Sequence, residues 1–414
     1  MPALPLNARR IMDRCDSLAR HSEDAGKLTR VYLSNEHRAA AGEVITWMRE
    51  AGMHAGLDAA GNVIGRYEGS EPASHALLLG SHLDTVRDAG RYDGMLGVVV
   101  AIECVQAFAD VGRRFPFAIE IAGFGDEEGA RFGTTLLGSR ALAGTFDFDA
   151  LNARDRNGTT LAQAMHEFAL DPANVIAAAK KKTDLLAYVE LHIEQGPVLE
   201  SLGLPVGVVT AVNGFSRLRI ILAGRAGHAG TVPMNLRRDA LAAAAECLLA
   251  IERIAQSIPD LVATVGRIEA GPGAINVIPG DVTFTMDVRS PDNEVRTRTV
   301  TRMLDEIRAI ATRREISLEV ERLQEQKVAA CAEWLMRQLD DAVAAENHAI
   351  RRLPSGAGHD GMAMQSIADI AMLFVRCKDG ISHNPAESIT AEDALSGARV
   401  LARFIENFIP CGPQ

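Results

Sequence analysis

Four short, largely apolar runs most limit what this chain can fold into. They cover residues 75–80, 115–122, 185–191 and 370–375, and stretches with helical periodicity, such as residues 8–50 and 95–109, lie before and between them. A continuous apolar run of this length is typical of a strand that is buried on both faces. Strands that alternate with helices indicate an α/β domain with a mainly parallel sheet and helices on both faces.

A different pattern occupies residues 213–326. Polar and apolar side chains alternate there, which suits a sheet with one solvated face. The predicted strands are 217–223, 261–269, 281–289 and 316–322, and the predicted helices are 236–255 and 293–312. Their β-α-β-β-α-β order is that of the ferredoxin-like fold. We therefore expect an α+β domain at 213–326, inserted into a larger domain formed by residues 1–212 and 327–414.

The composition excludes several classes of partner. The chain has 43 Lys and Arg against 54 Asp and Glu, a net charge of −11, and only 5% aromatic residues. An acidic chain without a basic block, and with few aromatic side chains for base stacking, is not built to hold nucleic acid or anionic lipid. Its most apolar stretch contains Glu103 and is too short to span a bilayer. Six scattered cysteines and the lack of an N-terminal signal favour a cytoplasmic location.

The first candidate site residue is His82, in the motif GSHLDTV directly after the strand predicted at 75–80. Ligands of open α/β sheets bind at the carboxyl ends of strands, where His82 is expected. Asp84 is placed to accept a hydrogen bond from the second ring nitrogen of His82, the usual way to fix the tautomer of a metal-binding histidine. Taken alone, the pair is as readily a loop histidine beside a surface aspartate.

Carboxylates occupy two further turns. Asp93 stands just before the helix predicted at 95–109, where an aspartate most often only caps the helix. Asp126, Glu127 and Glu128 follow the strand predicted at 115–122. Like charges crowded in a partly dry site repel one another unless a metal or a proton compensates them. One glutamate that binds a metal, with its neighbour acting as a general base, would resolve that repulsion.

Two histidines complete the set. His192 lies at the end of the strand predicted at 185–191, and His383 lies in a Gly/Pro-containing loop after the strand at 370–375. Either histidine alone means little, but all these positions map to one edge of one sheet. His82, His192 and His383, together with Asp93 and one of the two glutamates, suit two divalent metals that share one carboxylate.

The ordered motifs of the chain resemble one family. They are GSHLDTV, RYDGMLGVV, DEEGARF, LHIEQGPVLE, AGHAGTVPM and SHNPAE, and they extend over nearly the whole chain. This set resembles the hydantoinase/carbamoylase family of metal-dependent amidases. That family includes N-carbamoyl-L-amino acid amidohydrolases, allantoate amidohydrolases and β-ureidopropionases, and it belongs with the dinuclear-zinc aminoacylase and carboxypeptidase-type hydrolases.

The resemblance implies a role for each metal ligand. Asp93 would bridge two metals, with His82 and His192 on one metal and Glu128 and His383 on the other. The metals would be Zn²⁺ or Mn²⁺, and Co²⁺ or Ni²⁺ would accept the same ligands. The larger domain would be catalytic, and the inserted domain would act as a lid and as the interface of a homodimer.

The resemblance also implies roles in catalysis and in substrate binding. Glu127 would be the general base, and Asp84 would orient His82. His228 would reach the active site of the other subunit and stabilise the oxyanion. The substrate-binding positions would be Gln195, His228, Asn276, Arg289 and Gly358.

The expected reaction is hydrolysis of the ureido C–N bond of a small acid, with release of ammonia and carbon dioxide. Allantoate and N-carbamoyl-L-amino acids both fit, with a slight preference for allantoate. The alternative within enzymes is an aminoacylase or peptidase that cleaves an ordinary amide on the same scaffold. A second alternative is a non-catalytic ligand-binding or scaffold protein, which usually requires the loss of a metal ligand or of the base.

Overall fold

The computed structural model describes residues 4–71 and 74–411. Its chain divides into two compact units, the first made of Met1–Thr210, Cys331–Leu353 and Ala357–Gln414, and the second of Ala211–Ala330 and Pro354–Gly356. None of the helices in the described part of the chain is long and apolar enough to cross a membrane.

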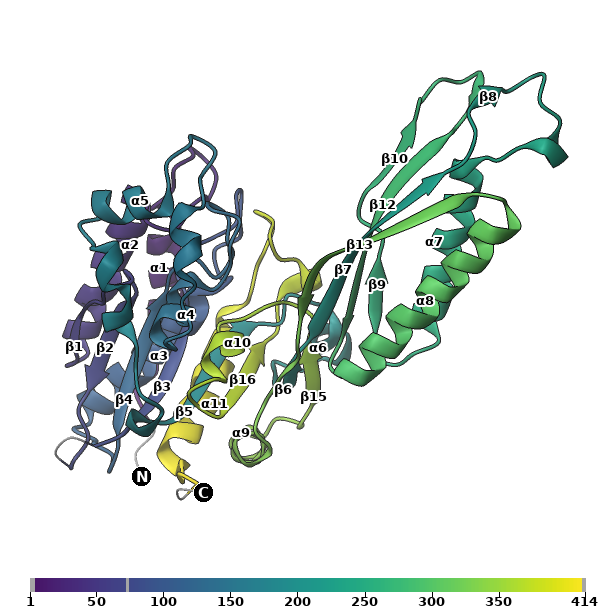
Figure 1. The fold of residues 1–414 in the computed structure, drawn as a ribbon. Coiled ribbons are helices and arrows are strands. Elements are labelled where there is room, and N and C mark those ends of the chain that lie inside the picture. Colours follow the sequence, from purple (N-terminus) through teal and green to yellow (C-terminus); the bar gives the residue numbers. More distant parts are fainter. Residues whose placement is uncertain (1–3, 72–73, 412–414) are drawn as a thin grey trace. The chain divides into compact units, whose positions relative to one another are not determined.

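The main sheet has a parallel centre and antiparallel margins (Figure 1). The parallel strands, in spatial order, are β4 (Ala118–Phe124), β3 (Ala76–His82), β5 (Leu185–Ile193) and β16 (Ile370–Val375). The antiparallel strands are β1 (His54–Leu57) and β2 (Val63–Tyr67) beyond β4, and β6 (Val206–Val212) beside β16. Two short strands, β14 (Ala329–Ala330) and β15 (Arg352–Ser355), pair with β6. This arrangement confirms the predicted α/β class, and the parallel strands are the four apolar runs of the sequence.

Helices cover both faces of this sheet. The helices of the first unit are α1 (Ala8–Leu18), α2 (Asn35–Glu50), α3 (Met95–Asp110), α4 (Leu137–Leu142), α5 (Leu161–Glu167), α6 (Val198–Leu202), α9 (Glu333–Ala345), α10 (Gly361–Met364) and α11 (Ala391–Asn407). Short 3-10 turns are η1 (Phe148–Asn152), η2 (Pro172–Ala178), η3 (Lys182–Asp184) and η5 (Lys378–Gly380). Gly397 of α11 packs against Leu191 of β5, whereas Gly361 of α10 packs against Tyr188. Odd and even residues of a strand point to opposite faces, so α11 and α10 lie on opposite sides of β5.

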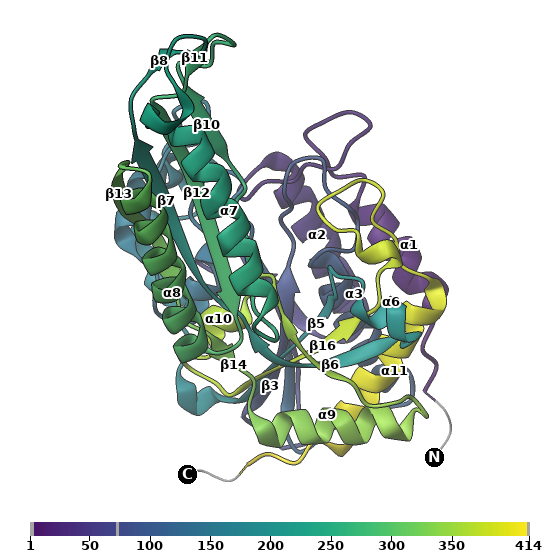
Figure 2. The same ribbon diagram turned by 90° about the vertical axis from the view of Figure 1, so that its right-hand side faces the viewer.

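The second unit is a smaller α+β structure. Its sheet has the order β10 (Ile268–Gly271), β12 (Asp281–Ser290), β7 (Gly214–Ala223) and β13 (Ser317–Gln326), with β9 (Val262–Thr264) also beside β12. Helices α7 (Ala240–Gln256) and α8 (Asn293–Arg313) pack side by side on one face, as Figure 2 shows. A separate pair of strands, β8 (Gly227–His228) and β11 (Val277–Ile278), and the turn η4 (Met234–Leu236) complete the unit. Alternate residues of β7 and β12 are buried under the two helices, as their sequence pattern requires.

Two sequence predictions differ from the observed elements. Residues 8–50 form α1 and α2 rather than one helical stretch, with an irregular segment between them that contains Gly26 at φ +76°. Residues 261–269 form two short strands, β9 and β10, because the chain leaves β12 between them. In both segments the predicted type of element is confirmed, but each is divided into two elements.

Candidate metal centre

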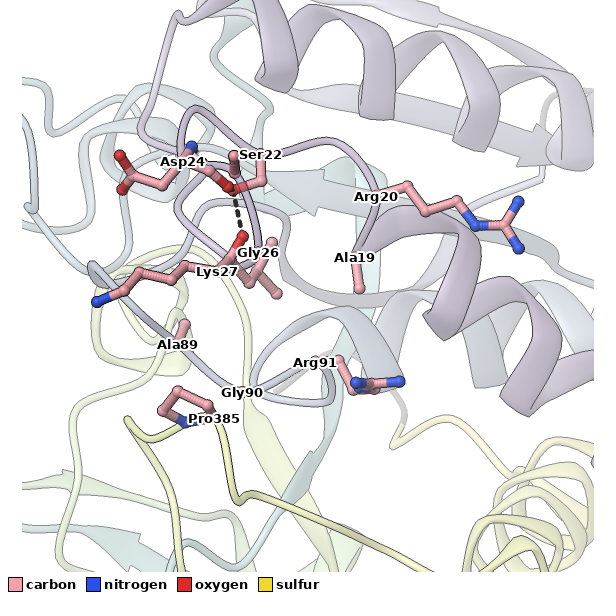
Figure 3. A pocket seen from close by; sticks show the side chains of 12 residues that line it. Ala19, Arg20, Ser22, Asp24, Gly26, Lys27, Ala89, Gly90, Arg91 and Pro385 are labelled. Carbon is pink, nitrogen blue, oxygen red and sulfur yellow. Dashed lines mark hydrogen bonds between the residues drawn. The ribbon is translucent and has the colours of Figure 1, made fainter.

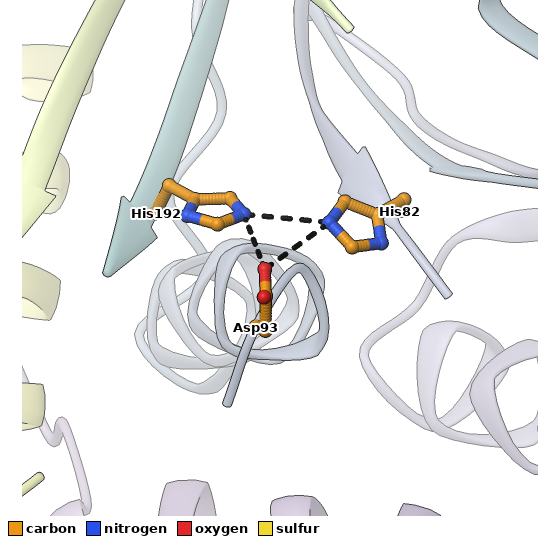
Figure 4. Close-up of side chains that lie close together, drawn as sticks. All are labelled: His82, Asp93 and His192. Carbon is orange, nitrogen blue, oxygen red and sulfur yellow. Dashed lines mark hydrogen bonds and ion pairs between the residues drawn. The ribbon is translucent and has the colours of Figure 1, made fainter. Parts of the chain in front are cut away.

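His82, Asp93 and His192 meet at the carboxyl end of the parallel strands (Figure 4). His82 is the last residue of β3, His192 lies near the end of the neighbouring β5, and Asp93 precedes α3. The Nε2 atoms of His82 and His192 lie 3.5 Å and 3.2 Å from Asp93 Oδ1, and 3.4 Å from each other. All three side chains are buried. Parallel neighbouring strands therefore bring together two imidazoles that are 110 residues apart in sequence.

The tautomers of both histidines follow from their outer contacts. His82 Nδ1 lies 3.0 Å from the carbonyl oxygen of Asp84, and His192 Nδ1 lies 2.9 Å from that of Ile193. A carbonyl oxygen only accepts, so each Nδ1 carries a hydrogen, and in the neutral imidazole Nε2 then presents a lone pair. In agreement with this, the backbone N–H of Gly94 donates to His192 Nε2 at 3.1 Å.

Asp84 contacts His82 in a different way from the one predicted. Its carboxylate oxygen lies 3.7 Å from His82 Nδ1, farther than its own backbone carbonyl. The carboxylate instead accepts the backbone N–H groups of Glu127 and Glu128, at 3.1 Å and 3.2 Å. Asp84 therefore links the end of β3 to the loop that carries the two glutamates.

A second group of donors gathers on the other side of Asp93. His383 Nε2 lies 3.2 Å from Asp93 Oδ2 and 3.3 Å from Glu128 Oε1. These two carboxylates raise the pKa of His383 to about 10. Asp93 therefore belongs to both groups, with Oδ1 facing His82 and His192 and Oδ2 facing His383.

Glu127 lies beside Glu128 and is buried. Burial raises the pKa of its carboxyl group well above the usual range, and the neighbouring Glu128 adds to the effect while His82 opposes it. His82, Glu127 and Glu128 form a further group of donors close enough to share an ion. Gly358 lies near this carboxyl group, since a Cβ at Gly358 would stand 3.4 Å from Glu127 Oε1.

The chemistry of these donors fits divalent cations. Two imidazole lone pairs converge on one carboxylate oxygen, and Asp93 Oδ1 has no hydrogen-bond donor in the described structure. A buried convergence of lone pairs and negative charge is unfavourable unless a cation or protons compensate it. Borderline metals such as Zn²⁺ and Mn²⁺ accept this mixture of imidazole and carboxylate.

Three residues beside the centre, Gln195, Ser382 and Glu387, contact Asp93. Gln195 Nε2, a predicted substrate-binding group, donates to Asp93 Oδ2 at 3.0 Å. Ser382 and Glu387 were not singled out from the sequence, although both lie within the motif quoted around His383. The hydroxyl of Ser382 lies 3.0 Å from Asp93 Oδ2, and Glu387 accepts the backbone N–H of Asp93 at 3.1 Å. Their position at the two ends of the SHNPAE motif was the available signal.

The remaining predicted residues lie in the second unit. His228 in β8 is exposed and accepts a hydrogen bond from the backbone N–H of Gly230 at 3.0 Å. Asn276 lies opposite, where its carbonyl oxygen accepts the N–H of Ala229 at 2.9 Å. Arg289 in β12 lines a cleft of about 620 Å³ within this unit. Two of its nitrogens pair with the carboxylate of Asp287, at 3.1 Å and 3.0 Å. That pairing holds the guanidinium plane of Arg289 in place.

A surface hollow of about 490 Å³ lies near the loops of Asp93 and His383, and no predicted site residue lines it (Figure 3). Gly90 and Pro385, from the two loops, both line this hollow. Two of its cations are already paired, Lys27 with Asp88 and Arg91 with Asp16. The predicted metal ligands therefore lie in the metal centre and not in this hollow.

Comparisons with known proteins agree with this geometry. Residues 78–407 match the sequence profile of peptidase family M20/M25/M40. An N-carbamoyl-L-amino acid amidohydrolase of Geobacillus stearothermophilus is 45% identical over 379 residues, which cover 92% of this chain and 93% of the relative. A probable allantoate deiminase of Oryza sativa subsp. japonica is 39% identical over 426 residues, which cover 95% of this chain and 87% of the relative.

The fold has a near match among solved structures. The crystal structure of an amidase of the hydantoinase/carbamoylase family from Burkholderia multivorans superposes with a TM-score of 0.92 at 31% identity, over 99% of this chain and 100% of that one. The family profile covers most of the chain, and both relatives match along more than nine-tenths of it. This chain therefore belongs to peptidase family M20/M25/M40, on the hydantoinase/carbamoylase branch.

Proposed function

We propose that this hydrolase cleaves the ureido C–N bond of a small acid at a two-metal centre. The observation that carries the proposal is the position of Asp93, which directs one carboxylate oxygen to each of two histidine-containing groups. The names of two relatives support a ureido acid as the substrate. The Geobacillus stearothermophilus relative is named for N-carbamoyl-L-amino acids, and the rice relative is named for allantoate.

Five residues would hold the two divalent metals. His82 and His192 would serve one position, Glu128 and His383 the other, and Asp93 would bridge them. When bound, such metals polarise a carbonyl oxygen and lower the pKa of water, which a poorly electrophilic ureido carbonyl requires.

Glu127 would act as the general base. It takes the proton of the attacking water and returns it to the leaving nitrogen. Burial raises the pKa of Glu127, and a raised pKa favours transfer of the proton onto the carboxylate. Asp84 would support this step by holding the backbone N–H groups of Glu127 and Glu128.

The second unit would act as a lid and as a homodimer interface. His228 would stabilise the oxyanion in the active site of the other subunit, a contribution worth about 3 kcal/mol for one donor. Arg289, already oriented by Asp287, would bind the carboxylate of the substrate. Asn276, Gln195 and the backbone at Gly358 would complete the contacts.

Release of ammonia tests the proposal. The purified protein, loaded with Mn²⁺ or Zn²⁺, is incubated separately with allantoate, with N-carbamoyl-L-amino acids, with β-ureidopropionate and with N-acetyl amino acids. Ammonia and carbon dioxide from a ureido acid are expected. A free amino acid from the N-acetyl compounds, without ammonia, would establish the aminoacylase alternative. No turnover together with near-zero bound metal would establish a non-catalytic protein.

The role of His228 has its own test. Subunits carrying His228→Ala are mixed with subunits carrying Glu127→Ala, and the activity of the mixture is compared with that of each variant alone. Partial recovery is expected, since one site of the mixed dimer has both groups. Absence of recovery would remove the action across subunits but not the metal site.

A cytoplasmic location is part of the proposal. All six cysteines are free, and five of them are buried. Free thiols in this number suit a reducing compartment.

A further inference from the structure

Glu387 is a buried carboxylate that contacts the loop of Asp93 from a distant part of the chain. It is 4% exposed. Its Oε1 atom accepts the backbone N–H groups of Tyr92 at 2.8 Å and of Asp93 at 3.1 Å, across 294 residues of sequence from Asp93. These N–H groups directly precede α3, so one oxygen of Glu387 anchors the backbone of the residue that faces both donor groups.

The other oxygen of Glu387 reaches the side chain of Asp93 through one hydroxyl. Ser382 Oγ lies 3.0 Å from Glu387 Oε2 and 3.0 Å from Asp93 Oδ2. Gln195 Nε2 donates to the same Asp93 oxygen at 3.0 Å and to Ser382 Oγ at 3.2 Å. Backbone and carboxylate of Asp93 are thus both connected to Glu387, and Asp93 has little freedom to turn.

The two loops are also packed without spare room. A Cβ at Gly90 would overlap the carboxyl group of Glu387, so the chain passes over Glu387 as closely as a glycine permits. No Lys or Arg among the described residues lies within ion-pair distance of Glu387. Its carboxylate therefore depends on the backbone N–H groups of Tyr92 and Asp93, and on the single hydroxyl hydrogen of Ser382, which it shares with Asp93 Oδ2. A buried carboxylate that lacks an ion-pair partner is destabilised when its hydrogen bonds are lost, so it restricts the positions of the groups that donate to it.

We infer that Glu387 is a positioning residue that fixes Asp93 relative to His383, so that each Asp93 oxygen faces a separate metal. Glu387 and Ser382 lie on the same loop as His383, and their bonds to Asp93 join that loop to the start of α3. The inference rests on the two-metal centre proposed above. Loss of Glu387 is expected to weaken the Asp93–Glu128–His383 position, and to leave the His82–Asp93–His192 position occupied.

The test measures metal binding rather than turnover. Chelator-treated protein is titrated with Co²⁺, and the visible absorption of the bound ion reports each binding event. For Glu387→Ala we expect one Co²⁺ with the wild-type dissociation constant and a second whose dissociation constant is raised about 10- to 100-fold, the range for loss of an outer contact to a metal ligand. Glu387→Gln keeps an oxygen for the two N–H groups and should recover most of the second event.

Asp155→Ala is the matched control. Asp155 is a carboxylate of the same unit that also accepts two backbone N–H groups, from Asn157 at 2.9 Å and Thr159 at 3.1 Å, and a bond from Arg131. Its loss should lower stability without changing either Co²⁺ constant. Equal weakening in this control would show that Glu387 acts only through stability, which overturns the inference.

Three further outcomes are decisive. Two Co²⁺ events with wild-type constants in Glu387→Ala would overturn the positioning role. If that variant does not fold, as judged by circular dichroism, Ser382→Ala decides, because it removes the hydroxyl between the carboxylates of Glu387 and Asp93 and keeps the two backbone N–H bonds to Glu387. Wild-type constants in Ser382→Ala would then overturn the inference. Fewer than two Co²⁺ ions on the wild-type chain would instead contradict the proposed two-metal centre itself.

Discussion

His82 and His192 direct their Nε2 atoms at each other across 3.4 Å, while each Nδ1 faces a backbone carbonyl. The carbonyls require a hydrogen on each Nδ1, so in the neutral imidazoles two Nε2 lone pairs face each other beside a carboxylate. A cation between the donors would stabilise this arrangement. A bound cation would therefore explain why three buried polar side chains meet where the parallel strands end.

Removal of metal should therefore destabilise the first unit. A ligand that binds only the folded state stabilises it by about 2.7 kcal/mol at 100 times its dissociation constant. We expect treatment with a chelator to lower the melting temperature and abolish turnover, and added Zn²⁺ or Mn²⁺ to restore both. Calorimetry of the treated and reloaded protein checks this. An unchanged melting temperature, with metal removal verified by elemental analysis, would contradict it.

Gly94→Ala should disrupt the centre more than it strains the backbone. Gly94 has φ +75°, and a Cβ there would overlap the imidazole of His82. Gly112 is the control, because it has φ +69° but open space around the Cβ position. Both substitutions place a Cβ at positive φ, which should cost about 1 kcal/mol at Gly112 and more at Gly94, whose ψ of −55° is that of a classic γ-turn. Only Gly94→Ala should also lose bound metal, as measured by elemental analysis after dialysis. Equal metal contents in the two variants would refute the steric argument.

Glu127→Gln should remove catalysis and keep the metals. The amide cannot take a proton, so kcat should fall by about 10²- to 10⁴-fold, the usual contribution of a general base. Its metal content should match that of the wild type, because Glu128 and not Glu127 is the proposed ligand. Glu120→Gln is a control on β4, since Glu120 is also buried but pairs with Arg66 and Lys180. A wild-type kcat in Glu127→Gln would exclude the base assignment.

Arg289→Lys should weaken substrate binding. Arg289 is held by a two-point contact with Asp287, and a lysine cannot form the same planar contact with a carboxylate. We expect KM to rise about tenfold, the equivalent of one charge-assisted hydrogen bond, with a smaller change in kcat. Arg219→Lys on β7, whose guanidinium pairs with Glu321, is the control. An unchanged KM in steady-state assays of Arg289→Lys would remove Arg289 from the substrate site.

His37 should make the protein sensitive to acid. Burial, together with the nearby guanidinium of Arg30, lowers the pKa of His37 to about 3 from 6.5. The folded state keeps His37 neutral, while the unfolded state takes up a proton below about pH 6.5. The contribution of neutral His37 to the free energy of unfolding is fully present above pH 6.5. It is lost as the pH falls toward 3, by at most about 1.4 kcal/mol per pH unit.

The measurement is urea unfolding of metal-free protein at several pH values between 7.5 and 4.5. His37→Asn removes the titrating group, so its free energy of unfolding should fall less steeply with pH than that of the wild type. His166→Asn, on the surface of α5, should keep the wild-type slope. Parallel slopes for the wild type and His37→Asn would disprove the assignment.

The sheet and the identity of the donors were predictable from local patterns. Each parallel strand is a largely apolar run, as expected for a strand that is buried on both faces of a sheet. The site residues follow these runs, so their common edge could be expected. The strand β3 extends as far as His82 itself, which places the imidazole on the sheet rather than in a loop.

The amino-acid sequence by itself determined the α/β fold class and the donors at the strand ends, because periodic burial and residue type are local properties. The tertiary structure alone decided how those donors are used. It selected the backbone carbonyl of Asp84 over its carboxylate as the partner of His82, and it brought Glu387 to the backbone of Asp93. The Asp84 carboxylate is held by the backbone N–H groups of Glu127 and Glu128, and Glu387 reaches Asp93 across 294 residues of sequence. Both contacts depend on how separate loops pack against each other, and no pattern within one loop encodes the position of another.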